Sequence, residues 1–204
     1  MLNFFMGLDL GQAQDYTALA IVEKVTERNI LFGTQKEQYL VRHLQRFPLG
    51  TTYPVIVDRV LAMTRKPPLA GKMALVIDAT GVGRPVVDLF RQEGLKPIAV
   101  TITGGSTVTP AGGGYRVPKR DLVSALAVML QTKRLKISRQ LPDAKTLIEE
   151  LLNFRVTINP RTAHDSYEAW REGTHDDLVL ATALACWYGK RHRRMAPIAK
   201  PEGW

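Results

Sequence analysis

The sequence predicts an α/β fold in which a mixed β-sheet is flanked by helices. Residues 4–47 contain three strand-like runs separated by polar turns. A short apolar run at residues 73–77 is followed by a glycine-containing turn, a helical pattern and a further strand-like run. Most later apolar residues recur at helical spacing. A chain of 204 residues fits one such domain, or one domain with an appendage.

The N-terminal part predicts a three-stranded meander and then a helix. Residues 4–10 form an apolar first strand, and residues 17–25 are expected to pair with it antiparallel after a short turn. Residues 38–47 alternate and predict the third strand. Residues 54–63 carry apolar side chains at helical spacing, and two consecutive prolines soon afterwards end that helix.

The middle of the chain predicts parallel strands at the centre of the sheet. The continuous apolar run at 73–77 is typical of a strand covered on both faces, and it ends at Asp78. A helix is expected at about 85–93 and a strand at 97–102, which together give a β-α-β unit. The glycine-rich segment 103–116 predicts a loop or a flexible hairpin.

The C-terminal part is expected to be mainly helical. Pro118 begins a helix with one apolar face, and residues 135–137 predict a short strand. Residues 144–152 indicate an amphipathic helix, and residues 154–158 are interpreted as a strand. The run 178–188 is apolar nearly all round, which is typical of a buried helix.

Composition favours a polyanionic partner and excludes a membrane protein. The formal net charge is +9 and the pI is about 9.8, a balance that favours nucleic acid. No apolar stretch approaches the roughly 20 residues that span a bilayer, and the N-terminus lacks the basic region of a signal peptide. The single cysteine, Cys186, suits a reducing cytoplasm.

Three acidic positions lie at the edges of strongly apolar elements. Asp9 lies within the first strand, Asp78 ends the buried run, and Asp176 and Asp177 precede the buried helix. Each has a purely structural explanation as well: a turn at a strand end, a capped turn or a helix N-cap. A buried carboxylate costs several kcal/mol unless it is paired or bound to a metal.

If the fold brings these acids together, their charges would repel one another. Divalent cations relieve such repulsion and prefer hard oxygen ligands. Two ions about 3.5–4 Å apart can activate a water and stabilise the leaving oxygen during phosphodiester cleavage. The acids and the basic charge therefore point to metal-dependent hydrolysis of DNA.

Four segments carry a resemblance to a known family. They are GLDLGQAQDYTALAIV, VIDATGVGRPVVDLF, VPKRDLVSAL and HDDLVLATALA. Their order and spacing resemble the nuclease domain of phage terminase large subunits, a branch of the RNase H-like superfamily that is related to the resolvase RuvC. The resemblance covers about residues 4–190.

The resemblance implies an RNase H-like mixed β-sheet flanked by helices, with the nuclease domain at residues 1–190 and a basic tail at 191–204. It also implies a divalent-metal-dependent endonuclease that cuts concatemeric viral double-stranded DNA during packaging, with two Mg²⁺ or Mn²⁺ ions. The matching catalytic and metal-binding acids are Asp9, Asp78, Asp176 and Asp177, with Asp15 as an auxiliary metal ligand. Adjacent helical residues point about 100° apart, and the sequence does not decide which of Asp176 and Asp177 is the direct ligand.

The same segments supply candidate DNA contacts. Lys119, Arg116 and Arg120 lie beside the glycine-rich segment and could approach the scissile phosphate, or they could form an ordinary solvated face. His175 could contact a phosphate or the leaving oxygen, although a polar residue before a helix has a simpler explanation.

The chain differs from a whole terminase large subunit because it has no G-x-x-x-x-G-K-[ST] motif, and so no P-loop for an ATPase motor. We expect an excised nuclease domain or a free-standing relative, acting in the host cytoplasm as a viral protein. Implied partners are a terminase ATPase motor, the small terminase subunit and the portal, with no membrane.

Other functions are compatible with parts of the sequence. A RuvC-like resolvase or a transposase-type nuclease would share the chemistry but would prefer branched DNA. A catalytically dead DNA-binding module would bind DNA without cutting it. An actin-like or sugar-kinase ATPase would bind ATP with magnesium, but it needs two such domains around the nucleotide.

Overall fold

The computed structural model describes residues 2–12, 15–29, 34–81, 83–157 and 176–192. Its strands are β1 (Phe4–Asp9), β2 (Ala18–Asn29), β3 (Thr34–Arg46), β4 (Met73–Asp78), β5 (Ile98–Thr103), β6 (Thr109–Ala111), β7 (Gly114–Pro118) and β8 (Leu135–Ile137). Its helices are α1 (Tyr53–Thr64), α2 (Gly83–Gln92), α3 (Lys119–Gln131), α4 (Ala144–Thr157) and α6 (Asp177–Arg191).

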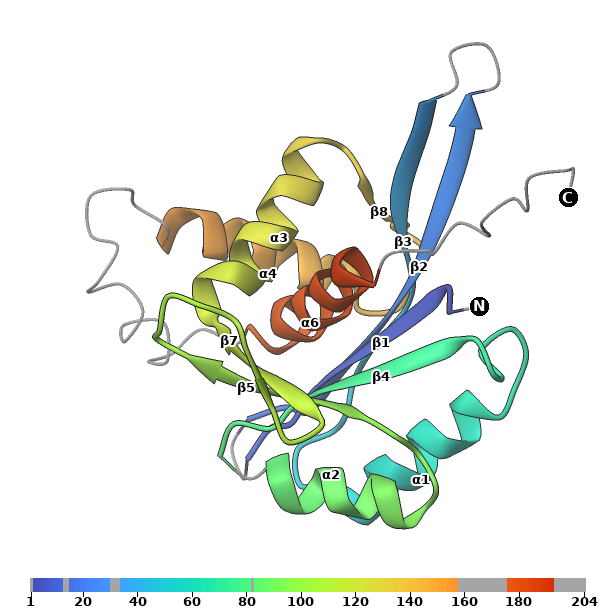
Figure 1. Ribbon diagram of the computed structural model, residues 1–204, viewed down its shortest axis with the longest axis vertical. Coiled ribbons are helices and arrows are strands. Elements are labelled where there is room, and N and C mark those ends of the chain that lie inside the picture. Colours follow the sequence, from blue (N-terminus) through green and yellow to red (C-terminus); the bar gives the residue numbers. More distant parts are fainter. Residues whose placement is uncertain (1, 13–14, 30–33, 82, 158–175, 193–204) are drawn as a thin grey trace, which may run out of the picture.

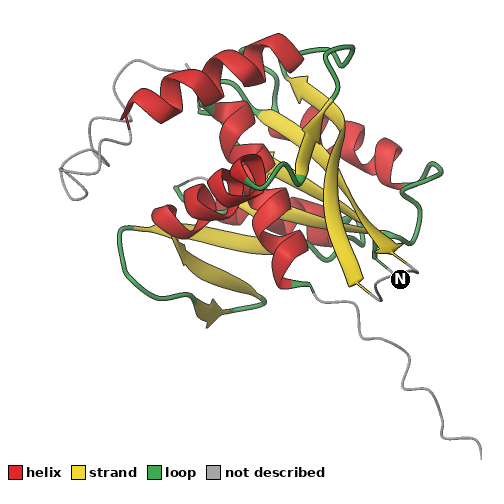
Figure 2. Ribbon diagram, turned by 90° about the horizontal axis from the view of Figure 1, so that it is seen from above, coloured by secondary structure: helices red, strands yellow, loops and turns green. Residues whose placement is uncertain are grey.

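The strands form one mixed sheet in the order β6-β7-β5-β4-β1-β2-β3-β8. Strands β1, β2 and β3 pair antiparallel, as the predicted meander requires. Strand β4 pairs parallel with β1, and β5 pairs parallel with β4. Figure 1 shows α1 and α2 on one side of the sheet and α3, α4 and α6 on the other, and Figure 2 shows the twist of the sheet between them. The predicted α/β fold is therefore confirmed.

The glycine-rich segment forms the β6–β7 hairpin, one of the two predicted alternatives, and β7 also extends the main sheet by pairing parallel with β5, which was not predicted. One segment contradicts a sequence prediction. The strand predicted at 154–158 is wrong for residues 154–157, which form the end of α4. A short apolar run fits a strand or the last turns of a helix equally well.

Strand alternation sends the side chains of β1 into two cores. Met6 and Leu8 pack with α1 and α2, whereas Phe5 packs with α3, α4 and α6. Because successive side chains of a strand point to opposite faces, Asp9 shares the face of Phe5. In β4 the same rule puts Asp78 on the face of Val76, which belongs to the core of Phe5. Both acids therefore lie on the side of the sheet that α6 covers.

Helix α6 crosses β1 in direct backbone contact. A Cβ atom on Gly7 would lie only 1.9 Å from the carbonyl oxygen of Ala181, so only glycine fits at this crossing. Near the other end of the helix, a Cβ atom on Gly189 would lie 2.9 Å from the ring of Phe5. The helix thus runs antiparallel to β1, and its N-terminus lies at the Asp9 end of the strand.

The C-terminal end of α6 is held by a buried lysine from β2. The Lys24 ammonium donates hydrogen bonds to the carbonyl oxygens of Gly189 (3.1 Å) and His192 (3.2 Å), and it forms an ion pair of 2.8 Å with Glu37. A cation at this end also complements the helix dipole. None of the helices in the described part of the chain has the length and apolar character to cross a membrane.

Candidate active site

Asp9 and Asp78 lie side by side at the carboxyl ends of two parallel strands. Leu8 of β1 is paired with Ile77 of β4, so the next residue of each strand is an aspartate. Neighbouring strands lie about 4.8 Å apart. The backbone N–H of Thr80 donates a hydrogen bond of 2.8 Å to Oδ1 of Asp78, which fixes that carboxylate where the chain leaves β4.

The N-terminus of α6 brings Asp176 and Asp177 to the same place. Asp177 is the first helical residue and is buried, whereas Asp176 precedes the helix and is half-buried. Burial raises the pKa of Asp9 well above its usual value, and the charges of Asp78, Asp177 and Asp176 raise it further. The fold thus brings four of the predicted acids into one cluster, which we call the acid cluster: Asp9, Asp78, Asp176 and Asp177.

Lys119 and Asp15 lie at the Asp176 side of the acid cluster. Burial raises the pKa of Asp176 most. The charge of Lys119 lowers this pKa, whereas the charges of Asp177 and Asp15 raise it, and the resulting value is about 6. Lys119 is the first residue of α3 and is half-buried, and Asp15 is exposed in the turn before β2. Both residues, predicted as a phosphate contact and an auxiliary metal ligand, thus lie near the acid cluster.

The other predicted DNA contacts lie in different surroundings. Arg116 is exposed on β7, opposite Thr101 of β5. Arg120 donates a hydrogen bond of 2.6 Å to the carbonyl oxygen of Ser106, which ties it to the loop between β5 and β6. His175 lies outside the described residues, as do residues 193–204 of the predicted tail.

Two charged residues beside the acid cluster were missed by the sequence analysis. Arg46, the last residue of β3, contacts the carboxylate of Glu150 and lies 3.2 Å from Oδ2 of Asp177. Glu150 is buried on α4, and its Oε2 accepts a hydrogen bond of 3.0 Å from the backbone N–H of Val179.

A weak signal for Glu150 was present in the sequence, because it follows the buried residues Ala144 and Leu147 at helical spacing. Burial raises the pKa of Glu150 most. The Val179 N–H and the Arg46 charge lower it, and Asp177 and Asp176 raise it again, to about 7.

The donor chemistry of the acid cluster fits a hard divalent cation. Its four side chains offer only carboxylate oxygens. The pKa of Asp9 is raised first by burial and then by the neighbouring negative charges, which a cation would counter. Within the described ranges, no three His, Cys, Asp or Glu side chains are arranged closely enough around one point to hold a metal ion as they stand. The fit therefore rests on the donor types and their proximity.

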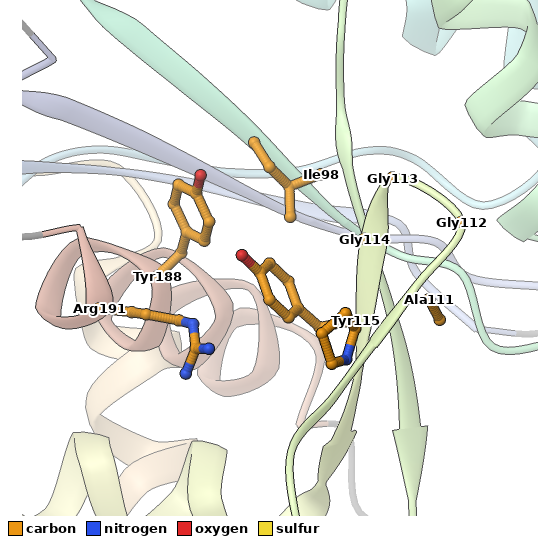
Figure 3. Close-up of a pocket in the computed structure, with 9 residues that line it drawn as sticks. Ile98, Ala111, Gly112, Gly113, Gly114, Tyr115, Tyr188 and Arg191 are labelled. Carbon is orange, nitrogen blue, oxygen red and sulfur yellow. The ribbon is translucent and has the colours of Figure 1, made fainter.

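A separate pocket lies at the opposite end of α6. It has a volume of about 550 Å³, and Figure 3 shows Ile98, Tyr115, Tyr188 and Arg191 around it beside the β6–β7 turn. Arg191 stacks over the ring of Tyr115, with 4.9 Å from Cζ to the ring centroid. At a rise of about 1.5 Å per residue, the 14 steps from Asp177 to Arg191 put this pocket about 21 Å from the acid cluster along the helix.

Comparison with protein families gives one match. A profile of the family described as Terminase RNaseH-like domain matches residues 57–188. The matched region contains three members of the acid cluster, Asp78, Asp176 and Asp177, as well as Glu150. Asp9, Asp15 and Arg46 precede it. A search of curated proteins returned no match.

Two solved structures share the fold. The large terminase nuclease from thermophilic phage G20c is 23% identical, with a TM-score of 0.52, over 90% of this chain and 80% of that chain. The human cytomegalovirus terminase nuclease domain, in a structure described as Mn soaked, is 15% identical, with a TM-score of 0.51, over 92% of this chain and 84% of that chain. At 90% and 92% coverage of this chain, both likenesses include at least part of the N-terminal region that precedes the profile match.

Proposed function

Because the chain belongs to the terminase RNaseH-like domain family, we propose that it is a divalent-metal-dependent endodeoxyribonuclease that cuts concatemeric viral DNA during genome packaging. The observation that carries the proposal is the convergence of Asp9, Asp78 and Asp177, from β1, β4 and α6, at one edge of the sheet. Burial raises the pKa of Asp9 most, and the charges of Asp78 and Asp177 raise it further, which supports a site that binds cations.

The acid cluster would hold two Mg²⁺ or Mn²⁺ ions, with Asp15 as an auxiliary ligand. Such ions supply an activated water and charge stabilisation for phosphodiester hydrolysis. Asp177 is buried, and its charge raises the pKa of Asp9 more than the charge of Asp176 does. Asp176 interacts with the charges of Lys119 and Asp15. We therefore assign Asp177 as the ligand nearer Asp9, and Asp176 as the ligand at the side where DNA enters.

DNA would approach from the Lys119 side of the acid cluster. Lys119 begins α3 directly after β7 ends at Pro118, and the exposed Arg116 lies in the middle of β7. Cations beside an acidic site attract the phosphate backbone and hold it in register without reading its sequence. His175 remains a candidate for the same role. Arg120 is less suited, because its side chain bonds to Ser106.

The family supports the proposed biological setting. Double-stranded DNA is the proposed substrate, and a terminase ATPase motor, a small terminase subunit and a portal are the proposed partners. The separate pocket beside Tyr115 takes no part in this proposal, because it lies at the far end of α6 from the acids.

The test is cleavage of supercoiled plasmid with Mg²⁺, Mn²⁺ or EDTA, comparing the wild type with Asp9→Asn. We expect nicking and linearisation that require a divalent metal and are lost in Asp9→Asn. A matched control is Asp58→Asn, which changes an exposed aspartate of α1 on the other face of the sheet and should cut like the wild type.

Three results would contradict the proposal. Cleavage that survives Asp9→Asn would remove the acid cluster from the reaction. Binding of duplex without cleavage in either metal would favour a DNA-binding module. A strong preference for branched over linear DNA would favour a resolvase.

A further inference from the structure

Arg46 connects the acid cluster to a buried carboxylate that the cluster does not include. The residue paired with Arg46 across the sheet is Ala18, and Ala18 is also the partner of Asp9. Asp9, Ala18 and Arg46 thus form one row across three strands. Ala18 is small and fully buried, so the first turn of α6 can lie above it. Asp177 then has Asp9 on one side and Arg46 on the other.

Both the side chain and the backbone of Arg46 are held in place. It contacts the carboxylate of Glu150, and its Cζ lies 4.6 Å from the ring centroid of Tyr16. The backbone N–H of Arg46 donates a hydrogen bond of 3.0 Å to Oδ2 of Asp143, just before α4. Only 17% of the Arg46 side chain is exposed. A side chain enclosed in this way is a poor DNA contact but a precise support for a neighbouring group.

Glu150 serves two partners on the same side of the cluster. One oxygen contacts Arg46, and the other accepts the Val179 N–H in the first turn of α6. Glu150 therefore fixes both the guanidinium and the start of the helix that carries Asp177. Replacing both members of a buried ion pair with apolar residues is often neutral for stability, so stability alone does not explain the pair of Arg46 and Glu150. The charge of Arg46 is better explained by its 3.2 Å ion pair with Asp177.

We propose that Arg46, anchored by Glu150, is a positioning residue that holds the carboxylate of Asp177 toward the acid cluster and thereby sets the affinity of the cluster for divalent cations. The inference rests on the proposed function only in taking Asp177 as a metal ligand. Residues that orient metal ligands without touching the ion typically change metal affinity or activity by about 10- to 100-fold when altered.

The test measures Mn²⁺ binding from the electron paramagnetic resonance signal of free Mn²⁺. It is carried out at a pH at which the carboxyl groups are ionised. The variants are Arg46→Met, Arg46→Lys and Glu150→Gln. Matched controls are Arg42→Met, on the same strand with a 53% exposed side chain, and Glu149→Gln, an exposed neighbour of Glu150. Duplex affinity in EDTA and far-UV circular dichroism are recorded for each variant.

We expect Arg46→Met and Glu150→Gln to weaken Mn²⁺ binding by roughly tenfold or more, with duplex affinity in EDTA unchanged. Arg46→Lys should be intermediate. Its ammonium keeps the charge, but it stops about one bond short of the Arg46 Nη2 position and lacks the planar group above Tyr16. Both controls should bind Mn²⁺ like the wild type. If Arg46→Met does not fold, Arg46→Lys and Glu150→Gln decide the question.

Unchanged Mn²⁺ affinity in folded Arg46 and Glu150 variants would overturn the inference, provided that Asp9→Asn has lost the ion. Tighter binding in Arg46→Met would also overturn it, because Arg46 would then merely oppose the cation. Loss of duplex affinity with normal Mn²⁺ binding would make Arg46 a phosphate contact instead. Wild type and Asp9→Asn that bind Mn²⁺ equally well would contradict the proposed function itself, which is a different result.

Discussion

Asp9 and its neighbours are costly to keep charged in the folded protein. The pKa values of Asp9, Asp176 and Glu150 are all raised, first by burial and then by the charges of neighbouring carboxylates, Asp177 in each case. A carboxyl with a raised pKa binds more protons in the folded state than in the unfolded state. Its contribution to stability is complete below the unfolded pKa and is lost as the pH rises through the folded value.

This linkage predicts how stability depends on pH without metal. In EDTA, the melting temperature should fall between about pH 4.5 and 7.5 as Asp176 and Glu150, whose pKa values are raised to about 6 and about 7, become ionised. The shift of Asp176 from 3.8 to about 6 alone corresponds to a loss on the order of 2–3 kcal/mol. The measurement is differential scanning calorimetry across this range for the wild type and Asp9→Asn.

The variant and the metal provide the controls for that experiment. Asp9→Asn should melt higher than the wild type at the upper pH, because one buried charge is gone, and its decline with pH should be smaller. Mn²⁺ should raise the melting temperature of the wild type most at the upper pH, where the carboxylates are ionised. A melting temperature that is flat or rises over the interval would contradict the assigned pKa directions.

At the scale of elements, α6 determines whether the acid cluster exists. Its N-terminal turn is bonded to Glu150, its C-terminal carbonyls are bonded to Lys24, and its middle rests directly on Gly7. These contacts come from α4, β2 and β1, so three separate elements fix the helix. Asp177 reaches Asp9 only because the helix is seated at this height above the sheet.

Gly7→Ala should therefore damage both stability and activity. The new methyl group would lie 1.9 Å from the Ala181 carbonyl oxygen, and relief requires α6 to move away from β1. We expect a loss of about 3 kcal/mol or more in the free energy of unfolding, at the upper end of overpacking costs. Urea unfolding measures it, and Mn²⁺ binding of the variant should weaken as Asp177 moves.

Gly104→Ala is the matched control for that substitution. A Cβ atom at Gly104 meets nothing within 4 Å, and its backbone has no positive φ. It should change the free energy of unfolding by less than about 0.5 kcal/mol, as is usual for surface substitutions. Equal effects of the two substitutions would contradict the close crossing of α6 and β1.

For the whole molecule, the basic charge and the acid cluster have opposite roles. A net charge of +9 attracts DNA over a long range, whereas the local acids repel phosphate until cations neutralise them. Cations near the cluster, such as Lys119, should therefore contribute most to bringing the duplex into place.

Duplex binding in EDTA should weaken steeply as salt increases. Lys119→Ala should lower the slope of log affinity against log salt by about 1, because one phosphate contact and its released counterion are lost. Arg59 is an exposed residue of α1, on the opposite face of the sheet, and Arg59→Ala should leave the slope unchanged. Fluorescence anisotropy over a salt series measures both. An equal loss in both variants would indicate diffuse attraction without a defined DNA path.

Much of the architecture could be predicted from local patterns. The meander, the β-α-β unit and the buried final helix all follow from apolar spacing and turn residues, which act over a few neighbours. The parallel pairing of β7 with β5 and the helical end of α4 could not be predicted in the same way. The spacing of apolar residues does not say which strands pair, and a short apolar run fits a strand or the end of a helix equally well.

Some features of the candidate site could likewise be predicted from local patterns, and others could not. The sequence by itself determined which acids lie at the ends of apolar elements: Asp9, Asp78 and the pair before α6. A carboxylate so close to buried apolar residues is costly unless it is paired or bound to a metal, which made these acids candidates for a site. Only the tertiary structure decided that Asp177 is the buried member of the pair, and that Arg46 and Glu150 support it. Those relations depend on the height and rotation of α6 above the sheet, which side-chain packing between distant segments sets and no local pattern records.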